Sequence, residues 1–336
     1  MEVILNLIRM EEEIKVDKHG FISPSSSPTS ENITRENARL EKWQDMLVRW
    51  DYNIKRRFNF VKKRVRKGIP DCLRGKVWAE FAEIEQLKSN YPENYYSNLT
   101  NFESDNVSIR DIMLDIHRTF PNHILFRDDG PGQQALFRVL KAYALHDTEL
   151  GYCQGMGFLI AMLLIYMSEE NAFWTLVAVM NKYELRGFYL PNMPGIYKAL
   201  YKINSLFSHY IPHLWKHLQS LHFLPSVFAP SWIMTLYISV FKTDISLRIL
   251  DIFFCEGTKI IYRVFINIFK NAKDELIGTN IDEILEKLKI LPEAYTPDEM
   301  IKSTFKISLG RKRLKDLEKE YETNPDPEFK NWWIIT

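Results

Sequence analysis

The chain has 336 residues, of which 46% are hydrophobic and 13% aromatic, so we expect a packed globular protein rather than a disordered one. Its 44 basic and 43 acidic residues nearly cancel, and this balance calls for neither a nucleic acid nor an acidic surface as partner. The three cysteines, Cys72, Cys153 and Cys255, form no CxxC pair, which excludes a disulfide framework and the usual zinc spacings and fits a reducing compartment.

Residues 1–31 are predicted to be a flexible N-terminal segment. The first 20 residues have the apolar spacing of a short amphipathic helix, whereas residues 23–30 are rich in serine and proline and carry nothing apolar to bury. The apolar start has no basic region before it and is followed at once by three glutamates, so we expect no signal peptide. These features favour a cytoplasmic protein, either free or peripheral on endomembranes.

Residues 32–67 are predicted to hold an N-terminal helix and a basic linker. Apolar residues recur at steps of three and four between Arg35 and Phe58, which is typical of a helix. A basic stretch then begins at Lys55 and ends at Lys67, interrupted by a few apolar residues. It is either the solvated side of a helix whose apolar positions pack inward, or a contact for an anionic membrane or an acidic protein face. We favour the first interpretation and expect no nucleic acid partner.

Gly68 and Pro70 interrupt the pattern, and Asp71 suits the start of a new helix, where its carboxylate can cap free amides. Helical patterns then follow one another, and they cover residues 71–87, 107–120, 133–146, 153–167, 169–182, 193–219, 227–241, 244–255, 258–273 and 280–289. No run alternates strictly between apolar and polar residues, and no repeat of fixed period is visible. The predicted fold class is therefore all-α.

Two uncharged stretches, residues 150–167 and 217–241, have the length of a membrane span. The first contains three glycines and a glutamine, and the second contains two prolines, so neither is a continuous apolar segment. We expect both to be buried core helices.

The region from residue 276 to 336 is predicted to be a C-terminal helical extension and tail. A charged helix follows Gly310, and Leu314, Leu317 and Tyr321 give it a thin apolar stripe that can dock on the main body. The last residues, which include Trp332 and Trp333, either pack back or serve as a docking peptide.

Several familiar chemistries find little support in the sequence. Histidines recur every four residues at His209, His213 and His217, but no acidic residue lies between or beside them, so no metal site is predicted. The glycines around residue 155 follow no strand and precede no Lys-Ser/Thr pair, so they are not a phosphate cradle. Without a nucleophile motif, a self-contained hydrolase or transferase is not indicated.

Asp115, Arg118 and Gln154 remain as candidate site residues. Asp115 and Arg118 are three residues apart and share one face of a predicted helix that Pro121 ends, so Arg118 is expected one turn before a rigid helix end. Gln154 lies in a turn flanked by glycines. These residues are either a surface ion pair and a polar helix start, or the two groups that accelerate GTP hydrolysis. In the second case the arginine neutralises charge on the phosphoryl oxygens and the glutamine orients the attacking water.

An ordered set of motifs extends across the main domain: Gly68-Ile69-Pro70 with Arg74 and Trp78, Ile112-x-x-Asp115-x-x-Arg118, and Tyr152-x-Gln154-Gly155-Met156. Together they resemble the three signature motifs of the TBC-domain family of Rab GTPase-activating proteins. Residues 224–232 and 247–257 resemble two later segments of the family, so that the resemblance covers residues 68–275. Gly157 departs from the family pattern, in which a small polar residue often follows the methionine.

The resemblance implies a mechanism with two fingers. Arg118 would be the arginine finger and Gln154 the glutamine finger, which stands in for the water-positioning glutamine of the Rab. Asp115 would fix the arginine loop, and Tyr152 would help to place the glutamine backbone and contact the GTPase. Gly155 would also support the site. Arg74 and Trp78 would be supporting residues with a mainly structural role.

The resemblance also implies a domain of two helical subdomains, residues 68–190 and 191–275. Its partner would be a GTP-bound Rab, which would hold the GTP and Mg²⁺, so no cofactor or metal is expected on this chain. The alternative is a non-catalytic TBC-like scaffold that docks a GTPase or an anionic membrane surface. The presence of both Arg118 and Gln154 favours the activator.

Overall fold

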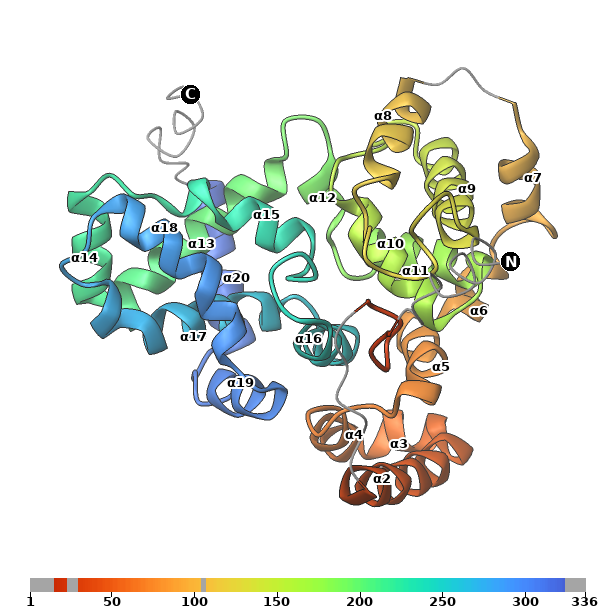
Figure 1. The fold of residues 1–336 in the computed structure, drawn as a ribbon, viewed down its shortest axis with the longest axis horizontal. Coiled ribbons are helices and arrows are strands. Elements are labelled where there is room, and N and C mark those ends of the chain that lie inside the picture. The colour runs from red at the N-terminus through yellow and green to blue at the C-terminus, as the bar shows by residue number, and fades with distance from the viewer. Residues whose placement is uncertain (1–14, 23–29, 104–106, 324–336) are drawn as a thin grey trace, which may run out of the picture.

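The computed structural model describes residues 15–22, 30–103 and 107–323. Within these residues the regular elements are helices, and the extended structure is limited to two isolated β-bridges. The prediction of an all-α fold is therefore confirmed. Figure 1 shows one group of helices from α5 to α12 and a second from α13 to α20. Helix α16 is the member of the second group that lies toward α5, and α2–α4 lie below both groups in this view.

The N-terminal part forms three helices, α2 (Ser30–Val48), α3 (Trp50–Arg56) and α4 (Phe58–Val65). Trp43 is buried, and its indole nitrogen donates to the carbonyl of Gly68 at 3.2 Å, which fastens α2 to the start of the main domain. The predicted basic linker is helix α4, whose Val61 and Val65 are buried against the body and whose neighbour is α16. This part of the chain is thus packed core rather than a connector.

The first group is arranged around α9 (Pro131–His146), against which α7, α8, α10 and α11 pack. Its members are α5 (Asp71–Ala82), α6 (Ile84–Lys88), α7 (Tyr95–Asn101), α8 (Val107–Ile116), α10 (Met156–Tyr166), α11 (Glu169–Asn181) and α12 (Arg186–Tyr189). The helix predicted over residues 71–87 is in fact broken at Glu83, whose φ is +56°. A left-handed residue stops a helix because it turns the chain away from the helix axis.

The second group contains α13 (Pro194–Tyr210), α14 (Pro212–Ser220), α15 (Ala229–Met234), α16 (Thr243–Glu256), α17 (Lys259–Leu276), α18 (Ile281–Ile290), α19 (Pro297–Thr304) and α20 (Arg311–Thr323). Two short 3₁₀ turns, Pro225–Val227 and Leu291–Ala294, complete it. The helix predicted over residues 193–219 is broken at Ile211 because Pro212 has no amide hydrogen to continue the ladder and instead begins α14. The helix predicted over residues 227–241 is reduced to α15, since Leu236 and Tyr237 have positive φ.

The C-terminal helix α20 docks on α13, as its apolar stripe predicts. Leu314 and Leu317 are buried, and the carboxylate of Glu318 accepts hydrogen bonds from Lys198 and Lys202, each at 2.9 Å. The predicted contacts of Trp332 and Trp333 lie outside the described residues.

Residues 15–22 differ from the prediction. The part of the expected amphipathic helix that the structure describes, residues 15–20, forms a turn with extended arms, and Val16 and Ile22 make an antiparallel bridge. Figure 1 shows this red segment near the middle of the molecule, between α5 and α16. It is packed against the body, whereas we expected it to be flexible.

None of the helices in the described ranges is long and apolar enough to cross a membrane. Residues 150–167 supply the buried helix α10, and residues 217–241 are divided among the end of α14, a 3₁₀ turn and α15.

Candidate functional site

The carboxylate of Asp115 connects the two loops that carry Arg118 and Gln154. Asp115 lies in the last turn of α8, and its side chain is only 2% exposed. One carboxylate oxygen pairs with Nε of Arg118, and the other accepts hydrogen bonds from the hydroxyl of Tyr152 and from the amide of Gly155, the latter at 3.4 Å. Sequence positions about forty residues apart therefore meet at one buried acid.

Arg118 lies in a turn rather than on the helix that we predicted. Helix α8 ends at Ile116, two residues before Arg118, and Phe120 has a φ of +52°. The hydroxyl of Thr119 caps the helix end by donating to the carbonyl of Asp115 at 2.9 Å. The arginine is nevertheless held, because its Nε contacts Asp115 while 53% of its side chain remains exposed. One edge of the guanidinium is fixed and the rest faces solvent.

Gln154 lies in the loop between α9 and α10, and its side chain is exposed. Glycine is required on either side of this loop, since Gly151 has a φ of +62° and Gly155 a φ of +99°. The amide of Gly155 points at Asp115, so the residue next to Gln154 is fixed by the same acid that holds Arg118.

Tyr152 and Cys153 are half-buried beside Asp115. Burial raises the pKa of the Tyr152 hydroxyl, and its hydrogen bond to Asp115 raises it further, so it remains a donor at neutral pH. Burial also raises the pKa of the Cys153 thiol, to which the nearby Asp115 carboxylate adds. A thiol with a raised pKa is a poor nucleophile, which agrees with the absence of a nucleophile motif.

Gly157 is the position that departs from the family pattern. It is buried, and a β-carbon placed there would lie 3.0 Å from the hydroxyl oxygen of Thr119 and 3.7 Å from Oδ2 of Asp115. The start of helix α10 therefore packs closely against the turn that carries Arg118.

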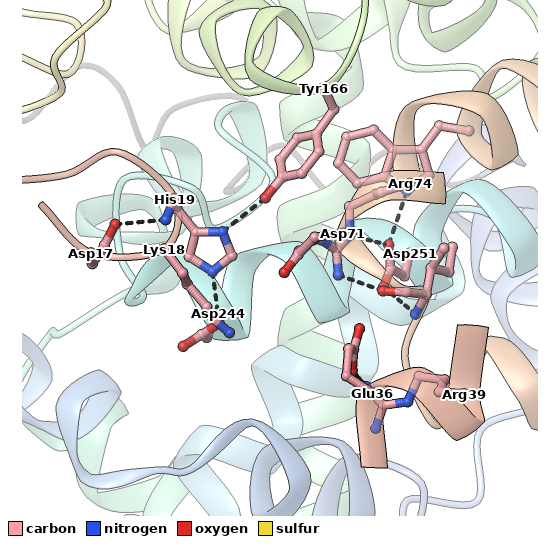
Figure 2. A network of polar contacts seen from close by, with 12 residues as sticks. Asp17, Lys18, His19, Glu36, Arg39, Asp71, Arg74, Tyr166, Asp244 and Asp251 are labelled. Atoms are coloured by element: carbon pink, nitrogen blue, oxygen red, sulfur yellow. Dashed lines mark hydrogen bonds and ion pairs between the residues drawn. The ribbon is translucent and has the colours of Figure 1, made fainter. Parts of the chain in front are cut away.

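Arg74 and Trp78 lie in a different cluster, centred on Asp251 of α16. Asp251 is fully buried, and its Oδ1 accepts from Nε of Arg74 and from the indole nitrogen of Trp78, each at 3.0 Å. Its Oδ2 accepts from the amide of Ile69 at 3.2 Å. Burial raises the pKa of the Asp251 carboxyl, and the charge of Arg74 opposes that shift. Figure 2 shows these contacts, which link α5 to α16 and so join the two groups of helices.

Sequence reasoning missed the importance of Asp251, which appeared only within a stretch that resembles the family. A signal was present, however: Asp251 is the one charged residue among the apolar residues of 249–254. A lone carboxylate in such a stretch must be paired where the helix is buried.

The histidines considered as metal ligands are not assembled. Tyr210 ends α13 and Pro212 begins α14, so His209 lies on a different helix from His213 and His217. Nε2 of His217 lies 2.9 Å from the carbonyl oxygen of Thr279. Among the described residues, no group of three or more His, Cys, Asp or Glu side chains is arranged to hold a metal ion.

The family assignment rests on a match to the model of the Rab-GTPase-TBC domain, which extends over residues 71–277 and so covers more than half of the chain. The chain belongs to the Rab-GTPase-TBC domain family. The recognition of the family from its motifs is thereby confirmed.

Curated relatives and solved structures agree with this membership. The chain is 34% identical over 304 residues to the human ecotropic viral integration site 5 protein homolog, and 32% identical over 339 residues to the Rab GTPase-activating protein eat-17 of Caenorhabditis elegans. These matches cover 89% and 94% of this chain, which spans 37% of the length of each relative.

The TBC domain of a Chlamydomonas flagellar RabGAP superposes with a TM-score of 0.71 at 26% identity, covering 87% of this chain and 99% of that one. The Ypt/Rab-GAP domain of Gyp1p superposes with a TM-score of 0.65 over 85% of this chain and 99% of its own, and its 18% identity supports the fold alone.

Proposed function

We propose that this chain is a GTPase-activating protein that supplies Arg118 and Gln154 in trans to a GTP-bound Rab GTPase. The observation that carries the proposal is the position of Asp115, whose carboxylate contacts both Arg118 and the backbone beside Gln154. Arg118 and the backbone next to Gln154, which lie on separate loops, are thereby held by one carboxylate before a partner arrives. Family membership and the relatives that are named as Rab GTPase-activating proteins support the choice of partner.

Arg118 would act on the charge that develops in the transition state. Its Nε faces the buried Asp115, which leaves the outer part of the guanidinium free to reach the phosphoryl oxygens of a docked nucleotide. An arginine supplied in this way accelerates hydrolysis by roughly 10³- to 10⁵-fold. Holding the side chain in advance reduces the entropy that must be lost when the transition state forms.

Gln154 would orient the attacking water in place of the glutamine of the Rab. Its exposed amide can both donate and accept a hydrogen bond, which is what a water between two groups requires. Neither role transfers a proton to or from the activator, so the proposed mechanism needs no general base on this chain. The GTP and Mg²⁺ would be bound by the Rab, and the activator would work in the cytoplasm.

Single-turnover GTP hydrolysis with a panel of purified Rabs tests the proposal. With a responding Rab, Arg118→Ala should lower the stimulated rate by about 10³-fold and Gln154→Ala should remove most of the stimulation. Arg313→Ala and Gln219→Ala are matched controls, since both residues are exposed on other helices and should leave the rate unchanged. The catalytic assignment is wrong if no Rab responds or if Arg118→Ala hydrolyses as fast as the parent. A parent protein that binds a Rab without stimulating its hydrolysis would instead be a scaffold.

A second candidate function, contact with an anionic membrane, is favoured by one observation. The basic stretch of residues 55–67 does not form a single face, because Arg66 turns inward and pairs with the buried Glu256 at 2.6 Å. Two other cations of this stretch, Arg57 and Arg64, line a pocket of about 460 Å³ on the N-terminal helices. Lys42 and Arg49 line the same pocket, and Asp45 is the one acid among its lining residues. Tyr52 and Val48 are exposed beside these cations, so an apolar contact with lipid is available.

Co-sedimentation with phosphatidylcholine vesicles, with and without phosphatidylserine, tests this contact over a salt series. Binding of the parent should require the anionic lipid and weaken as salt screens the charges. Arg57→Glu combined with Arg64→Glu should abolish it, whereas Lys315→Glu combined with Lys319→Glu on α20 should not. Equal binding by the two variants would show that the pocket is not the contact.

A further inference from the structure

Residues 15–22, which we name the N-terminal strap, form a tight turn of their own. The carboxylate of Asp17 accepts from the amides of His19 and Phe21 at 2.8 and 3.0 Å, and the amide of Gly20 donates to the carbonyl of Asp17 at 3.0 Å. Gly20 has a φ of +90°, and a β-carbon there would lie 2.7 Å from Nε2 of His123. Only glycine allows the strap to approach the body this closely.

One side of the strap is bonded to the segment that directly follows Arg118. The amide of Ile22 donates to the carbonyl of Asn122 at 2.8 Å, and the amide of Ile124 donates to the carbonyl of Gly20 at 3.0 Å. These two bonds run in opposite directions between the two segments, so they fix the register of residues 120–124 against the strap. Phe21 and His123 also form an isolated antiparallel bridge.

His123 adds a directed side-chain bond to this contact. The amide of Leu125 donates to its Nδ1 at 3.1 Å, which leaves Nε2 to carry the hydrogen. Nε2 then donates to the carbonyl of His19 at 2.8 Å. Since His123 is buried, this bond is shielded from competing water.

The ring of Phe21 packs on Phe120, the residue with positive φ in the turn that carries Arg118. Phe120 has a φ of +52°, a conformation that a bulky residue adopts only when its surroundings hold it there. The ring of Phe21 lies edge-on to that of Phe120 with centroids 5.1 Å apart, and Phe126 and Phe158 contact the same ring at 6.0 and 5.8 Å. The strap thus supplies one of three aromatic neighbours that hold this residue two positions after Arg118.

The other side of the strap is bonded to both groups of helices. Nδ1 of His19 lies 2.9 Å from the hydroxyl of Tyr166 at the end of α10, and Nε2 lies 2.8 Å from Asp244 near the start of α16. Figure 2 shows His19 between these two partners, next to the Asp251 cluster. Lys18 also pairs with Asp244 at 2.7 Å. The strap therefore takes its own position from the rigid body of the protein and can transmit that position to residues 120–124.

We propose that the N-terminal strap is a positioning element of the active site, in which Phe21 and His19 hold the turn that presents Arg118. The strap lies outside the region matched by the family model, which begins at residue 71. Phe21 and His19 are positioning residues, because they act through Phe120 and His123 and do not reach the exposed guanidinium. The inference rests on the proposed function insofar as Arg118 is the arginine finger.

Two measurements on the full chain test the strap. In the first, amide hydrogen exchange without a partner is compared between the parent and Phe21→Ala, and exchange at residues 118–124 should accelerate about tenfold or more. In the second, single-turnover hydrolysis with a responding Rab is followed as a function of activator concentration. The maximal stimulated rate should fall by about 10- to 100-fold, because a displacement of about 1 Å at a catalytic group has that effect, while the half-saturating concentration changes far less.

Three variants make the result specific. Phe21→Tyr keeps the ring and should restore both exchange and rate, and Gly20→Ala should reproduce the defect by separating the strap from His123. Phe305→Ala removes an equally half-buried ring elsewhere, which contacts Arg66 and Arg263, and should change neither measurement.

Unchanged exchange at residues 118–124 in both Phe21→Ala and Gly20→Ala would overturn the proposal. Accelerated exchange with an unchanged maximal rate would overturn it too, because the strap would then hold the turn without serving catalysis. In either case a loss of stimulation in Arg118→Ala would leave the proposed function intact. If Arg118→Ala instead keeps full activity, the proposed function fails, and this outcome is recognised without any strap variant.

Discussion

The hydroxyl of Tyr152 donates a hydrogen bond to the carboxylate of Asp115, which connects the loop before α10 to the end of α8. Asp115 is almost fully buried and also pairs with Arg118, so the tyrosine fixes one oxygen of the acid while the arginine occupies the other. The geometry of the two candidate fingers therefore depends on a residue that need not touch the nucleotide.

Replacing Tyr152 with phenylalanine removes this hydrogen bond and little else. The buried carboxylate then lacks one of its donors, and we expect the free energy of unfolding to fall by about 1–3 kcal/mol. The stimulated rate should fall by about tenfold, since the loop of Gln154 loses one of its two contacts with Asp115. Urea unfolding and single-turnover hydrolysis measure the two effects. Tyr210→Phe is the control, because its hydroxyl bonds the carbonyl of Ser308 far from the site. Equal rates for the two variants would contradict the role of Tyr152.

Replacing Gly155 with alanine tests the backbone of the glutamine loop. A β-carbon would meet no atom closer than 3.7 Å, so space is available, but the φ of +99° is unfavourable for any L-residue. We expect a loss of about 1–2 kcal/mol in stability and a lower stimulated rate as the loop relaxes away from Asp115. Gly278→Ala serves as the control, because it has a φ of +86° with no atom within 4 Å and should reduce stability without changing the rate. A rate that stays at the parental value in Gly155→Ala would show that the loop tolerates the change.

Replacing Arg74 with methionine should separate stability from activity. The change leaves the buried carboxylate of Asp251 without its counter-charge, and breaking a buried pair in this way costs about 3–5 kcal/mol. Arg138→Ala, which removes an ion pair with Glu169 in which the arginine is 42% exposed, should cost less than about 1 kcal/mol. Urea unfolding gives both values. The rate per folded molecule of Arg74→Met should match that of the parent; a specific loss would mean that Arg74 belongs to the catalytic machinery.

The contribution of His123 to stability should weaken in mild acid, because a proton on Nδ1 removes the hydrogen bond that this nitrogen accepts from the amide of Leu125. Burial lowers the pKa of the His123 imidazole, and His19 lowers it further, while the hydrogen bond to the His19 carbonyl and the Asp17 carboxylate oppose the shift. In the unfolded chain His123 has a pKa of about 6.5, so below that pH the unfolded chain binds more protons than the folded one. The contribution of His123 is therefore complete above about pH 6.5 and is lost as the pH falls through the lowered folded pKa.

Urea unfolding of the parent and of His123→Gln between about pH 5 and 8 checks this dependence. The difference in unfolding free energy between the two proteins should shrink as the pH falls. A difference that stays constant over the range would contradict the assignment of the titration to His123.

Helical periodicity was sufficient to predict the fold class and most of the helices, because the buried stripes of α9, α16 and α17 are long and continuous. The breaks at Glu83 and Ile211 were missed. Glu83 lies inside an apolar pattern that continues on both sides of a left-handed residue, and Pro212 was assigned to the predicted helix rather than to the start of a new one. Periodicity reports which residues face the core and does not report where the ladder of hydrogen bonds stops.

The roles assigned to the candidate site residues stay predictions, and the sequence did not foresee how these residues are arranged. The i,i+3 spacing correctly paired Asp115 with Arg118, yet the sequence assigned the arginine to a helix that in fact ends at Ile116. The contact of Tyr152 and Gly155 with Asp115 joins loops that only the tertiary fold brings together. The strap was missed for a similar reason: eight residues whose bonds are mostly to distant parts of the chain carry no periodic signal.

The most direct test of the proposal that this chain supplies the glutamine in trans uses a Rab whose own switch glutamine has been replaced by alanine. Single-turnover hydrolysis by that Rab is measured with the parent protein and with Gln154→Ala. We predict that the parent retains most of its stimulation and that Gln154→Ala retains almost none, because no glutamine then remains to orient the water. If the parent fails to stimulate this Rab while it stimulates the unmodified one, the required glutamine belongs to the Rab and the assignment of Gln154 is contradicted.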